Sequence, residues 1–410
     1  MWTKLLDRML SHLMAEGQLE VAFPDGTRRT YGDGSSPSVS VVIHSPQVVR
    51  QLVTDPDLGL GEGYMNGDLT IENDDLFGLL TLAIKNKARA NGRIKGQSLR
   101  IWLRRVMRSL TQYNPIGKAQ SNVAHHYDLS GDLYDLFLDE DRQYSCAYFI
   151  HPDDTLEQAQ AQKKAHIAHK LLIRPGMKVL DIGCGWGGMG LTLAQDYGAQ
   201  VVGVTLSREQ HAVATERARM AGLADQVDFR LMDYREVDET FDRIVSVGMF
   251  EHVGVPHYQE YFSQVDRMLR PDGVALIHTI GRVKPPGFTS PFIAKHIFPG
   301  GYCPALSETM EAAENTDLVT TDVEVWRLHY AETLKHWRQR FEANIEKARA
   351  LYDDRFCRLW RYYLIASELT FRLDRQVVFQ LQMAHRQDTV PLTRDYLYSE
   401  PMSQMKHAAE

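Results

Sequence analysis

The sequence predicts an α/β protein whose larger part is built around a parallel sheet. From Asn122 onward, strand-like apolar runs alternate with helical patterns, which is typical of such sheets. One of these runs ends in a glycine-rich turn, Val179-Leu-Asp-Ile-Gly-Cys-Gly-Trp-Gly-Gly188. The first 84 residues have a different, hairpin-like pattern. With 410 residues, of which 44% are apolar, the chain is long enough for two or three domains.

Residues 1–84 are expected to form a small α+β domain. Met1–Gly17 is patterned as an amphipathic helix, and Pro24-Asp-Gly26 is a plausible hairpin turn between two strand-like runs. The expected strands are Gln18–Phe23, Thr27–Tyr31 and Val39–His44, and the expected helices are Pro46–Thr54 and Asp74–Ile84.

Residues 85–118 are expected to form a basic helical linker. Nine basic residues and no acidic residue lie between Lys85 and Arg108, and interleaved apolar residues have helical periodicity. Two interpretations stay open because a basic amphipathic helix is ambiguous without context. The segment either binds anionic lipid, at about 1 kcal/mol per basic residue, or packs its apolar side on its own domain.

Residues 119–390 are expected to form the sheet domain, with residues 391–410 as a C-terminal tail. Helix Ser207–Ala221 begins at a good N-cap, and helical excursions are expected at Pro285–Phe298 and Ala331–Phe371. In open α/β sheets ligands bind beyond the carboxyl ends of the strands, so we expect one cleft there. The seven expected strands are Lys178–Ile182, Gln200–Val204, Val227–Leu231, Arg243–Val247, Val274–Ile280, Val319–Leu328 and Val377–Ala384.

The glycine turn indicates a nucleoside site, but a G-x-G pattern alone also serves dinucleotides. A dinucleotide fold places an acidic residue at the tip of the second strand, about 20 residues on. Here Gln200–Val204 runs into Thr205-Leu-Ser-Arg-Glu-Gln210, with no acid at the tip. A dehydrogenase is therefore disfavoured.

The run Asp-Ile-Gly-Cys-Gly-Trp-Gly, together with Gly-Val-Thr-Leu-Ser-x-x-Gln, resembles the S-adenosylmethionine (SAM) site of the cyclopropane fatty acid synthase family. The resemblance implies a Rossmann-like, seven-stranded SAM-methyltransferase sheet with helical insertions, preceded by a small lipid-carrier-like domain. It also implies a set of cofactor-binding residues. These are Tyr127, Tyr144, Ser145, Asp181, Gly183, Cys184, Gly185, Gly187, Thr205, Leu206, Ser207, Gln210, Asp233 and Tyr234.

Five further residues match the family's bicarbonate pocket. A small oxyanion needs convergent donors, and a thiol, an imidazole, a phenol and a backbone amide supply them. The carboxyl group of the set would have to accept a proton, because two anions side by side repel. The five residues are Cys146, Glu251, His278, Ile280 and Tyr330.

The implied reaction is transfer of a methylene group from SAM to cis double bonds of unsaturated phospholipid acyl chains. Alkene attack on the methyl group leaves a carbocation, so the site must exclude water, and bicarbonate removes the proton that lets the ring close. Such base catalysis contributes about 10²–10⁴-fold. Two alternatives stay open: a lipid methyltransferase giving methyl-branched or methylene products without ring closure, and a lipid-binding regulatory protein with an inactive methyltransferase fold.

The composition of the chain limits which partners are expected. A net charge of −7 argues against nucleic-acid binding, and no run approaches the ~18 apolar residues of a membrane span. The four cysteines lack metal-ligand spacing, so no metal is expected. We expect a cytoplasmic protein that associates peripherally with the inner membrane face, and the resemblance implies a homodimer.

Overall fold

The computed structural model describes residues 1–89 and 131–398. These residues form two compact units. The first comprises residues 1–89, 288–299 and 331–376, and the second comprises residues 131–287, 300–330 and 377–398. The units therefore do not coincide with the expected continuous domains 1–84 and 119–390, because two later segments pack with the N-terminal residues. Most of the expected linker 85–118 and part of the tail 391–410 lie outside the described residues.

The first unit contains a four-stranded sheet in the order β2-β1-β3-β4. β1 pairs antiparallel with β2 across the predicted hairpin, where Phe23 N donates to Thr27 O at 2.8 Å. β1 also pairs parallel with β3, and β3 pairs antiparallel with β4. The strands are β1 (Gln18–Ala22), β2 (Arg28–Gly32), β3 (Ser38–Ile43) and β4 (Leu69–Ile71).

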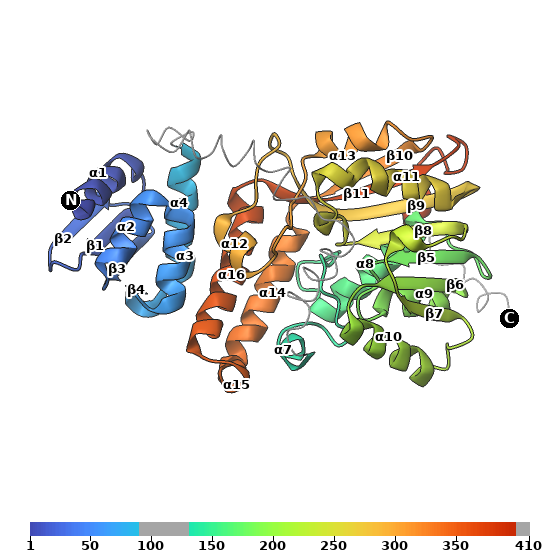
Figure 1. Ribbon diagram of the computed structural model, residues 1–410, viewed down its shortest axis with the longest axis horizontal. Coiled ribbons are helices and arrows are strands. Elements are labelled where there is room, and N and C mark those ends of the chain that lie inside the picture. Colours follow the sequence, from blue (N-terminus) through green and yellow to red (C-terminus); the bar gives the residue numbers. More distant parts are fainter. Residues whose placement is uncertain (90–130, 399–410) are drawn as a thin grey trace. The chain divides into compact units, whose positions relative to one another are not determined.

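Eight helices complete the described part of this unit (Figure 1). The long helix α16 packs against α3 and α4, and α12 packs against α3. Side chains of α16 and α12 therefore share one core with the N-terminal sheet. The helices are α1 (Trp2–Leu13), α2 (Pro46–Thr54), α3 (Pro56–Asn66), α4 (Leu76–Arg89), α12 (Pro291–His296), α14 (His329–Ala343), α15 (Ile345–Leu351) and α16 (Asp354–Leu373).

Helix α3 was not predicted from the sequence, because three glycines lower its intrinsic helix propensity. The structure gives these glycines a packing role. A Cβ at Gly61 would lie 2.3 Å from the ring of Phe292, and a Cβ at Gly59 would lie 2.8 Å from the backbone of Gln51. The close approach of α2 and α12 thus stabilises a helix that its own residues disfavour.

The second unit contains a seven-stranded sheet in the order β10-β11-β9-β8-β5-β6-β7, which confirms the predicted fold class. The pairs β5–β6, β6–β7, β5–β8 and β8–β9 are parallel, whereas β10 is antiparallel to β11. The strands are β5 (Lys178–Ile182), β6 (Gln200–Thr205), β7 (Val227–Leu231), β8 (Phe241–Val247), β9 (Leu269–Arg282), β10 (Val319–Trp326) and β11 (Gln376–Ala384).

Helices cover both faces of this sheet (Figure 1). Alternate strand residues point to opposite faces. Leu180 and Ile182 belong to a core with α11 and α13, whereas Val179 belongs to a core with α8, α9 and α10. The helices of this unit are α7 (Gly131–Asp135), α8 (Leu156–Lys170), α9 (Gly188–Tyr197), α10 (Arg208–Met220), α11 (Tyr258–Met268) and α13 (Leu306–Ala313).

Two predicted helical excursions differ in detail. Pro285–Phe298 is helical only at α12, because Pro285, Pro286 and Gly287 precede it and disfavour helix. Ala331–Phe371 is divided among α14, α15 and α16. No described helix is long and apolar enough to cross a membrane.

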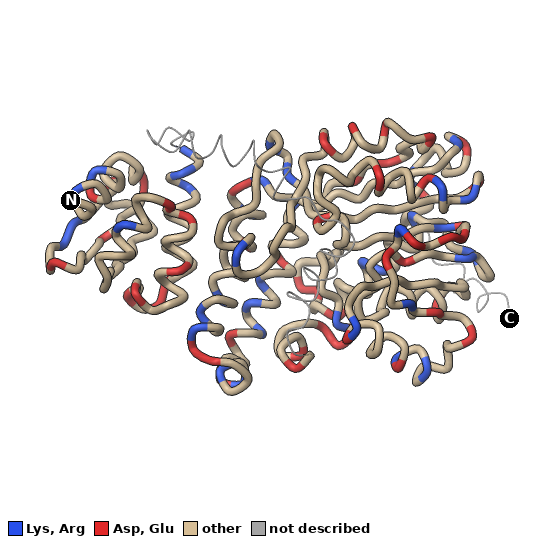
Figure 2. The backbone as a smooth tube through the Cα atoms, in the orientation of Figure 1, with Lys and Arg blue, Asp and Glu red and all other residues tan. Residues whose placement is uncertain are grey.

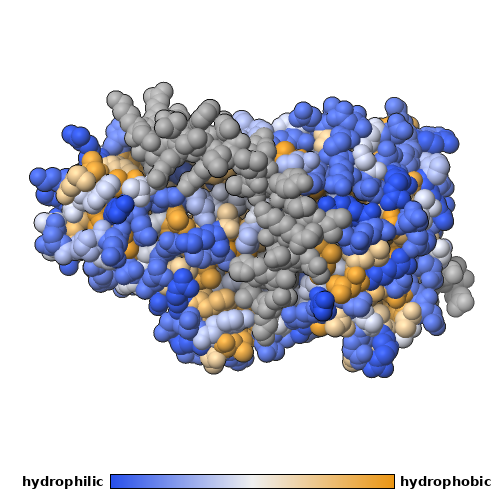
Figure 3. All heavy atoms as spheres, in the orientation of Figure 1, coloured by the Kyte–Doolittle hydropathy of each residue, from blue (hydrophilic) through white to orange (hydrophobic). Residues whose placement is uncertain are grey.

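The surface of the described residues is mixed in character. In Figure 2 acidic and basic positions are interspersed along the second unit. In the view of Figure 3 apolar residues on that unit are scattered among hydrophilic ones. The net charge is therefore not concentrated on the part of the second unit seen in this orientation.

Candidate active site

A cavity lies in the second unit at the carboxyl ends of β5, β6, β7 and β8. This is the edge at which open parallel sheets bind ligands. The turns after these four strands contribute its lining, together with the irregular segment 142–145. The lining residues are Arg142, Gln143, Tyr144, Ser145, Asp181, Ile182, Gly183, Cys184, Gly185, Trp186, Met189, Val204, Thr205, Leu206, Gln210, Met232, Asp233, Tyr234, Arg235, Val247, Gly248, Met249, His252, Val253 and His257.

The glycine turn between β5 and α9 forms the floor of this cavity. Gly183 N donates to Val204 O at 2.9 Å and ties the turn to β6. Gly185 has φ +54°, and no described atom lies within 4 Å of the place where a Cβ would stand. Gly187 has φ +85°, and its Cβ would lie 2.6 Å from the Phe229 ring. Gly185 thus leaves room for a ligand, whereas Gly187 allows α9 to pack on β7.

The segment after β6 presents an amide to the cavity. Thr205 Oγ1 donates to Gln210 Oε1 at 2.9 Å. Ser207 is buried and caps α10, since its Oγ accepts from Gln210 N at 3.3 Å. Because the Gln210 carbonyl oxygen is engaged, its NH₂ group is the part left to donate to a ligand.

Two buried carboxyl groups line the cavity in different states. Asp233 caps the short helix after β7, and Arg235 donates to both of its oxygens, at 2.9 and 2.8 Å. Asp181, on β5, has an Oδ2 with no hydrogen-bond partner among the described residues. Burial raises the pKa of Asp181 to about 7, and the charge of Lys163 opposes that rise. Of the two carboxyl groups, Asp181 is therefore the one with an oxygen left to accept a hydrogen bond from a ligand.

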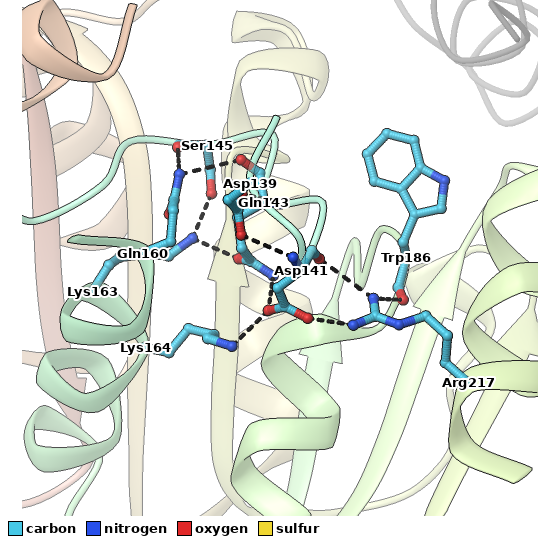
Figure 4. A network of polar contacts seen from close by, with 9 residues as sticks. All are labelled: Asp139, Asp141, Gln143, Ser145, Gln160, Lys163, Lys164, Trp186 and Arg217. Carbon is cyan, nitrogen blue, oxygen red and sulfur yellow. Dashed lines mark hydrogen bonds and ion pairs between the residues drawn. The ribbon is translucent and has the colours of Figure 1, made fainter. Parts of the chain in front are cut away.

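Segment 139–145 is held in place by a polar network (Figure 4). Asp139 Oδ1 accepts from Gln143 N at 2.9 Å. From α8, Lys163 Nζ donates to Gln143 Oε1 at 2.6 Å and to Ser145 Oγ at 2.8 Å. The wall that carries Tyr144 and Ser145 is thus fixed from behind by a helix.

Glu251 lies just beyond β8, in the 3₁₀ turn Phe250–His252. Its Oε1 accepts from Ile280 N at 2.5 Å, and its buried Oε2 has no hydrogen-bond partner in the described part of the chain. Burial raises the pKa of Glu251 to about 7. Near neutral pH this carboxyl group therefore populates both its acidic and its basic form.

His278 lies on β9, two residues before Ile280, so both side chains are on the same side of the strand. Gln380 Nε2, on β11, lies 3.0 Å from His278 Nδ1. The imidazole meets the Trp326 ring edge to face, with centroids 5.1 Å apart. Burial, reinforced by Lys163 and Lys170, holds the pKa of His278 well below its usual range, so this imidazole is neutral.

Cys146 and Tyr330 are buried on segments that touch one another. The Tyr148 ring stacks on the His329 ring at 4.7 Å, and Phe149 N donates to His329 Nδ1 at 3.1 Å. Because Cys146 precedes Tyr148 by two residues and Tyr330 follows His329 directly, these contacts bring the two residues into one neighbourhood.

A family model described as mycolic acid cyclopropane synthetase matches residues 116–381. The chain belongs to the mycolic acid cyclopropane synthetase family. It is a SAM-dependent methyltransferase of the cyclopropane-fatty-acyl-phospholipid synthase type. A second model, a domain of unknown function, matches residues 5–92.

Two relatives extend the match over most of the chain. It is 40% identical over 344 residues to the cyclopropane-fatty-acyl-phospholipid synthase of Escherichia coli, covering 83% of this chain and 86% of that protein. It is 34% identical over 397 residues to the tuberculostearic acid methyltransferase of Mycobacterium tuberculosis, covering 92% and 89%.

A solved structure shares the fold over about two thirds of the chain. The mycolic acid cyclopropane synthase complexed with SAH and CTAB aligns with a TM-score of 0.62 at 35% identity, covering 66% of this chain and 99% of that one. Membership of the cyclopropane synthetase family excludes the dehydrogenase interpretation and argues against an inactive fold.

The structure places most of the expected cofactor residues of this family member around one cavity. Two do not line it: Gly187 packs against Phe229, and Ser207 caps α10. Gly187 begins α9 after β5, and Ser207 begins α10 after β6, so each fixes the start of a helix next to the cavity. Tyr127 lies outside the described residues. The residues that line the cavity as expected are Tyr144, Ser145, Asp181, Gly183, Cys184, Gly185, Thr205, Leu206, Gln210, Asp233 and Tyr234.

Of the expected bicarbonate set, Glu251 and Ile280 are in direct contact. The Ile280 N–H, expected to donate to an anion, donates to Glu251 instead. Glu251 is buried, and its Oε1 lies 2.5 Å from Ile280 N near the end of β9.

Sequence reasoning missed the support behind the cavity. Lys163 and Gln160 occupy positions on the buried face of α8, between Leu156 and Ile167. The sequence signal that could have revealed this support is a lysine on the apolar face of a helix. Because Lys is almost never fully buried unless paired, such a lysine indicates buried polar partners. Trp186, Arg235 and His252 also line the cavity without having been predicted.

Proposed function

We propose that this enzyme transfers a methylene group from SAM to cis double bonds of unsaturated phospholipid acyl chains and forms cyclopropane fatty acids, with bicarbonate as the base. The observation that carries the proposal is the state of Glu251. One oxygen of this buried carboxyl group is held by Ile280 N, and the other has no partner among the described residues. The neighbouring residues Met249 and His252 line the cavity. An unsatisfied buried carboxyl group beside a ligand cavity is costly unless a ligand completes it.

The cavity fits SAM in its donor and acceptor set. Asp181 Oδ2 suits an ammonium group, the NH₂ of Gln210 suits a hydroxyl, and Gly185 leaves space against the backbone. Asp233 and Tyr234 flank the cavity at the end of β7, where a purine would lie. When bound, SAM supplies an electrophilic methyl group on a sulfonium. Residues of the chain bind and orient it.

The second set fits a small oxyanion. Glu251 in its protonated form donates from Oε2, and His278 and Tyr330 contribute further donors. The Cys146 thiol donates to Ala147 O at 3.3 Å and would have to turn from it to reach the anion. The Ile280 amide acts through Glu251, which it holds by Oε1. When bound, bicarbonate supplies a small base next to the substrate. With a pKa near 7, Glu251 accepts and releases a proton at Oε2 without a large energetic penalty in either direction.

Exclusion of water follows from burial. His278 is 2% exposed and Cys146 is 1% exposed, so the reacting atoms would be surrounded by protein. The Tyr148 ring stacks on the imidazoles of His166 and His329, with centroids 4.6 and 4.7 Å apart, so its faces are already covered by protein. Phe250, next to Glu251, packs in the core against Tyr258 and Tyr261.

The proposal has three further parts: membrane association, the segment that makes the contact, and the assembly. A phospholipid substrate requires peripheral association with the membrane, at its inner face if the protein is cytoplasmic. The related Escherichia coli enzyme is named for phospholipid acyl chains. We place the membrane contact in the basic segment from Lys85 to Arg108, most of which lies outside the described residues, and the functional assembly in a homodimer.

The test is a lipid assay with methyl-labelled SAM and vesicles of cis-unsaturated phospholipid, with and without bicarbonate after degassing. Upfield cyclopropane protons in the NMR spectrum that depend on bicarbonate and on Glu251 are expected. Glu251→Gln is the matched variant because it keeps the shape and removes the acid. If the ring product persists both without bicarbonate and in Glu251→Gln, the assignment of the base is contradicted.

A second candidate function is methyl transfer without ring closure. It is favoured by the likeness to a tuberculostearic acid methyltransferase over 397 residues and by the engagement of the Ile280 amide with Glu251. Cyclopropanes and methylene products both add CH₂, so mass alone does not separate them. Proton NMR does, and a labelled product without ring protons would establish the second candidate.

A further inference from the structure

Lys163 is a cation enclosed by protein. Its side chain is 0% exposed on α8, and it makes hydrogen bonds to Gln143 Oε1 at 2.6 Å and to Ser145 Oγ at 2.8 Å. Burying an ammonium is costly unless paired groups compensate. Both partners of Lys163 line the cavity, and Lys163 itself does not. The geometry therefore directs its charge at the wall of the site (Figure 4).

Gln160 holds the same wall from one turn earlier on α8. Its Nε2 donates to the backbone oxygens of Gln143 and Ser145, at 3.2 and 3.0 Å. Two side chains of one helix thus bind two residues, Gln143 and Ser145, on either side of Tyr144, through four hydrogen bonds. From the other side, Arg217 on α10 pairs with Asp141 and donates to Trp186 O at 2.7 Å.

The charge of Lys163 is balanced by several nearby groups. Burial lowers the pKa of Lys163 to about 8; Asp139, Asp141 and Cys146 oppose this, and Lys164 adds to it. Asp181, whose carboxyl group faces the cavity, responds to Lys163 in turn. Loss of this cation would therefore leave its hydrogen-bond acceptors unmatched and Asp181 without its compensating charge.

The groups near Lys163 are those of a polar end of the cavity. Gln143, Ser145 and Asp181 lie beside β5, whereas Met232 and Tyr234 follow β7, two strands along the sheet. Two strand spacings correspond to about 10 Å. A zwitterionic amino-acid group suits the polar end, and a purine suits the end with Met232 and Tyr234.

We propose that Lys163, assisted by Gln160, is a positioning residue that holds segment 143–145 against the amino-acid end of bound SAM. This inference rests on the SAM site of the proposed function. It assigns to a buried lysine a role in ligand affinity, although that lysine does not contact the ligand.

The test compares two probes by calorimetric titration: SAM, and 5′-methylthioadenosine, which lacks the amino-acid group. Lys163→Met is expected to weaken SAM binding by about 10- to 100-fold, the effect of leaving buried acceptors unpaired. Binding of methylthioadenosine should change by no more than about twofold. A loss of affinity for both probes to the same extent would overturn the proposal, because it would indicate general disruption.

Lys170→Met is the matched control. Lys170 lies on the same helix, is 0% exposed, and is paired with Glu324 at 2.5 Å rather than with segment 143–145. We expect it to lower the melting temperature without changing SAM affinity by more than about twofold. If the two lysine variants weaken SAM binding equally, the positioning role is contradicted.

Gln160→Leu keeps the proposal testable if Lys163→Met does not fold. It removes the two neutral hydrogen bonds to segment 143–145 and leaves the buried charge in place. It should show the same selective loss of SAM over methylthioadenosine, about 5- to 10-fold. If the wild-type protein itself binds no SAM, the proposed function fails; if wild type binds and the variants bind equally well, only this inference fails.

Discussion

Gln380 and His278 are joined by a 3.0 Å hydrogen bond between Nε2 and Nδ1, across the neighbouring strands β11 and β9. Both side chains are buried, and burial holds the pKa of His278 well below its usual range. With the amide donating to Nδ1, the proton of the neutral imidazole resides on Nε2. A residue of the last strand therefore sets the tautomer of an expected anion ligand.

Gln380→Met is expected to lower kcat by about tenfold, because His278 loses the hydrogen bond that fixes its tautomer. SAM affinity should stay unchanged, since neither residue lines the cofactor cavity. Steady-state kinetics and calorimetry measure the two effects. Gln382→Met is the control, because Gln382 is equally buried on β11 but donates to Lys170 O. Equal losses of kcat in both variants would refute the specific role of Gln380.

Glu251→Gln is expected to lower the rate of product formation by about 10²-fold or more, because general acid–base catalysis contributes about 10²–10⁴-fold. It should also stabilise the protein at pH 8. The pKa of Glu251 in the folded state, about 7, lies above its usual value of 4.5, so the folded protein binds this proton more tightly than the unfolded chain. Stability from this group is present below pH 4.5 and is lost as pH rises through 7.

The measurement is the melting temperature of wild type and Glu251→Gln at pH 5 and pH 8. The variant should gain up to about 3 kcal/mol at pH 8 relative to its effect at pH 5. Glu314→Gln, at an exposed position, serves as the control. A pH-independent difference between wild type and the variant would show that Glu251 does not titrate in this range.

Gly187→Ala is expected to destabilise the second unit by about 2–4 kcal/mol. Residue 187 has a left-handed backbone conformation, with φ +85°, that disfavours a side chain. The added Cβ would also lie 2.6 Å from the Phe229 ring. Gly222→Ala separates the two causes, because Gly222 has φ +70° and no described atom within 4 Å of its Cβ position. Its cost should be about 1–2 kcal/mol. Thermal unfolding compares them, and similar costs would mean that the Phe229 contact relaxes freely.

Ser207→Ala and Gln210→Leu should separate helix capping from ligand contact. Loss of the Ser207 cap is expected to cost about 1 kcal/mol of stability. Gln210 lines the cavity, so its replacement should weaken SAM binding by about tenfold. Melting temperatures and calorimetric titration give the two readouts. If Ser207→Ala weakens binding as much as Gln210→Leu, Ser207 is more than a cap.

Elements with local signals were predictable. The hairpin around Pro24-Asp-Gly26, the N-cap at Ser207 and the strands of the large sheet all follow from patterns within a few residues. Helix α3 was not predictable, because its glycines are tolerated only by contacts with α2 and α12. The same holds for segments 288–299 and 331–376, whose partners lie far away in the sequence.

For the candidate site, the sequence motifs identified residues that line the cavity but not the residues behind them that hold the lining in place. Asp181, Gly185 and Gln210 lie in contiguous motifs whose spacing carries information. The pairing of Lys163 with Ser145 and of Gln380 with His278 joins residues 18 and 102 positions apart, and no local pattern records it. Two expected cofactor-binding residues, Gly187 and Ser207, do not line the cavity: Gly187 packs against Phe229, and Ser207 caps α10.

The sequence by itself determined the sheet and the glycine turn and pointed to Glu251 as the proposed acid, because these depend on periodicity, on backbone freedom and on residue type. Only the tertiary structure decided the chemical state of that acid. Glu251 has its raised pKa because folding removes it from water, directs Ile280 N at one oxygen and leaves the other unpaired. Desolvation and hydrogen-bond geometry arise from residues distant in the chain, so they exist only once it has folded.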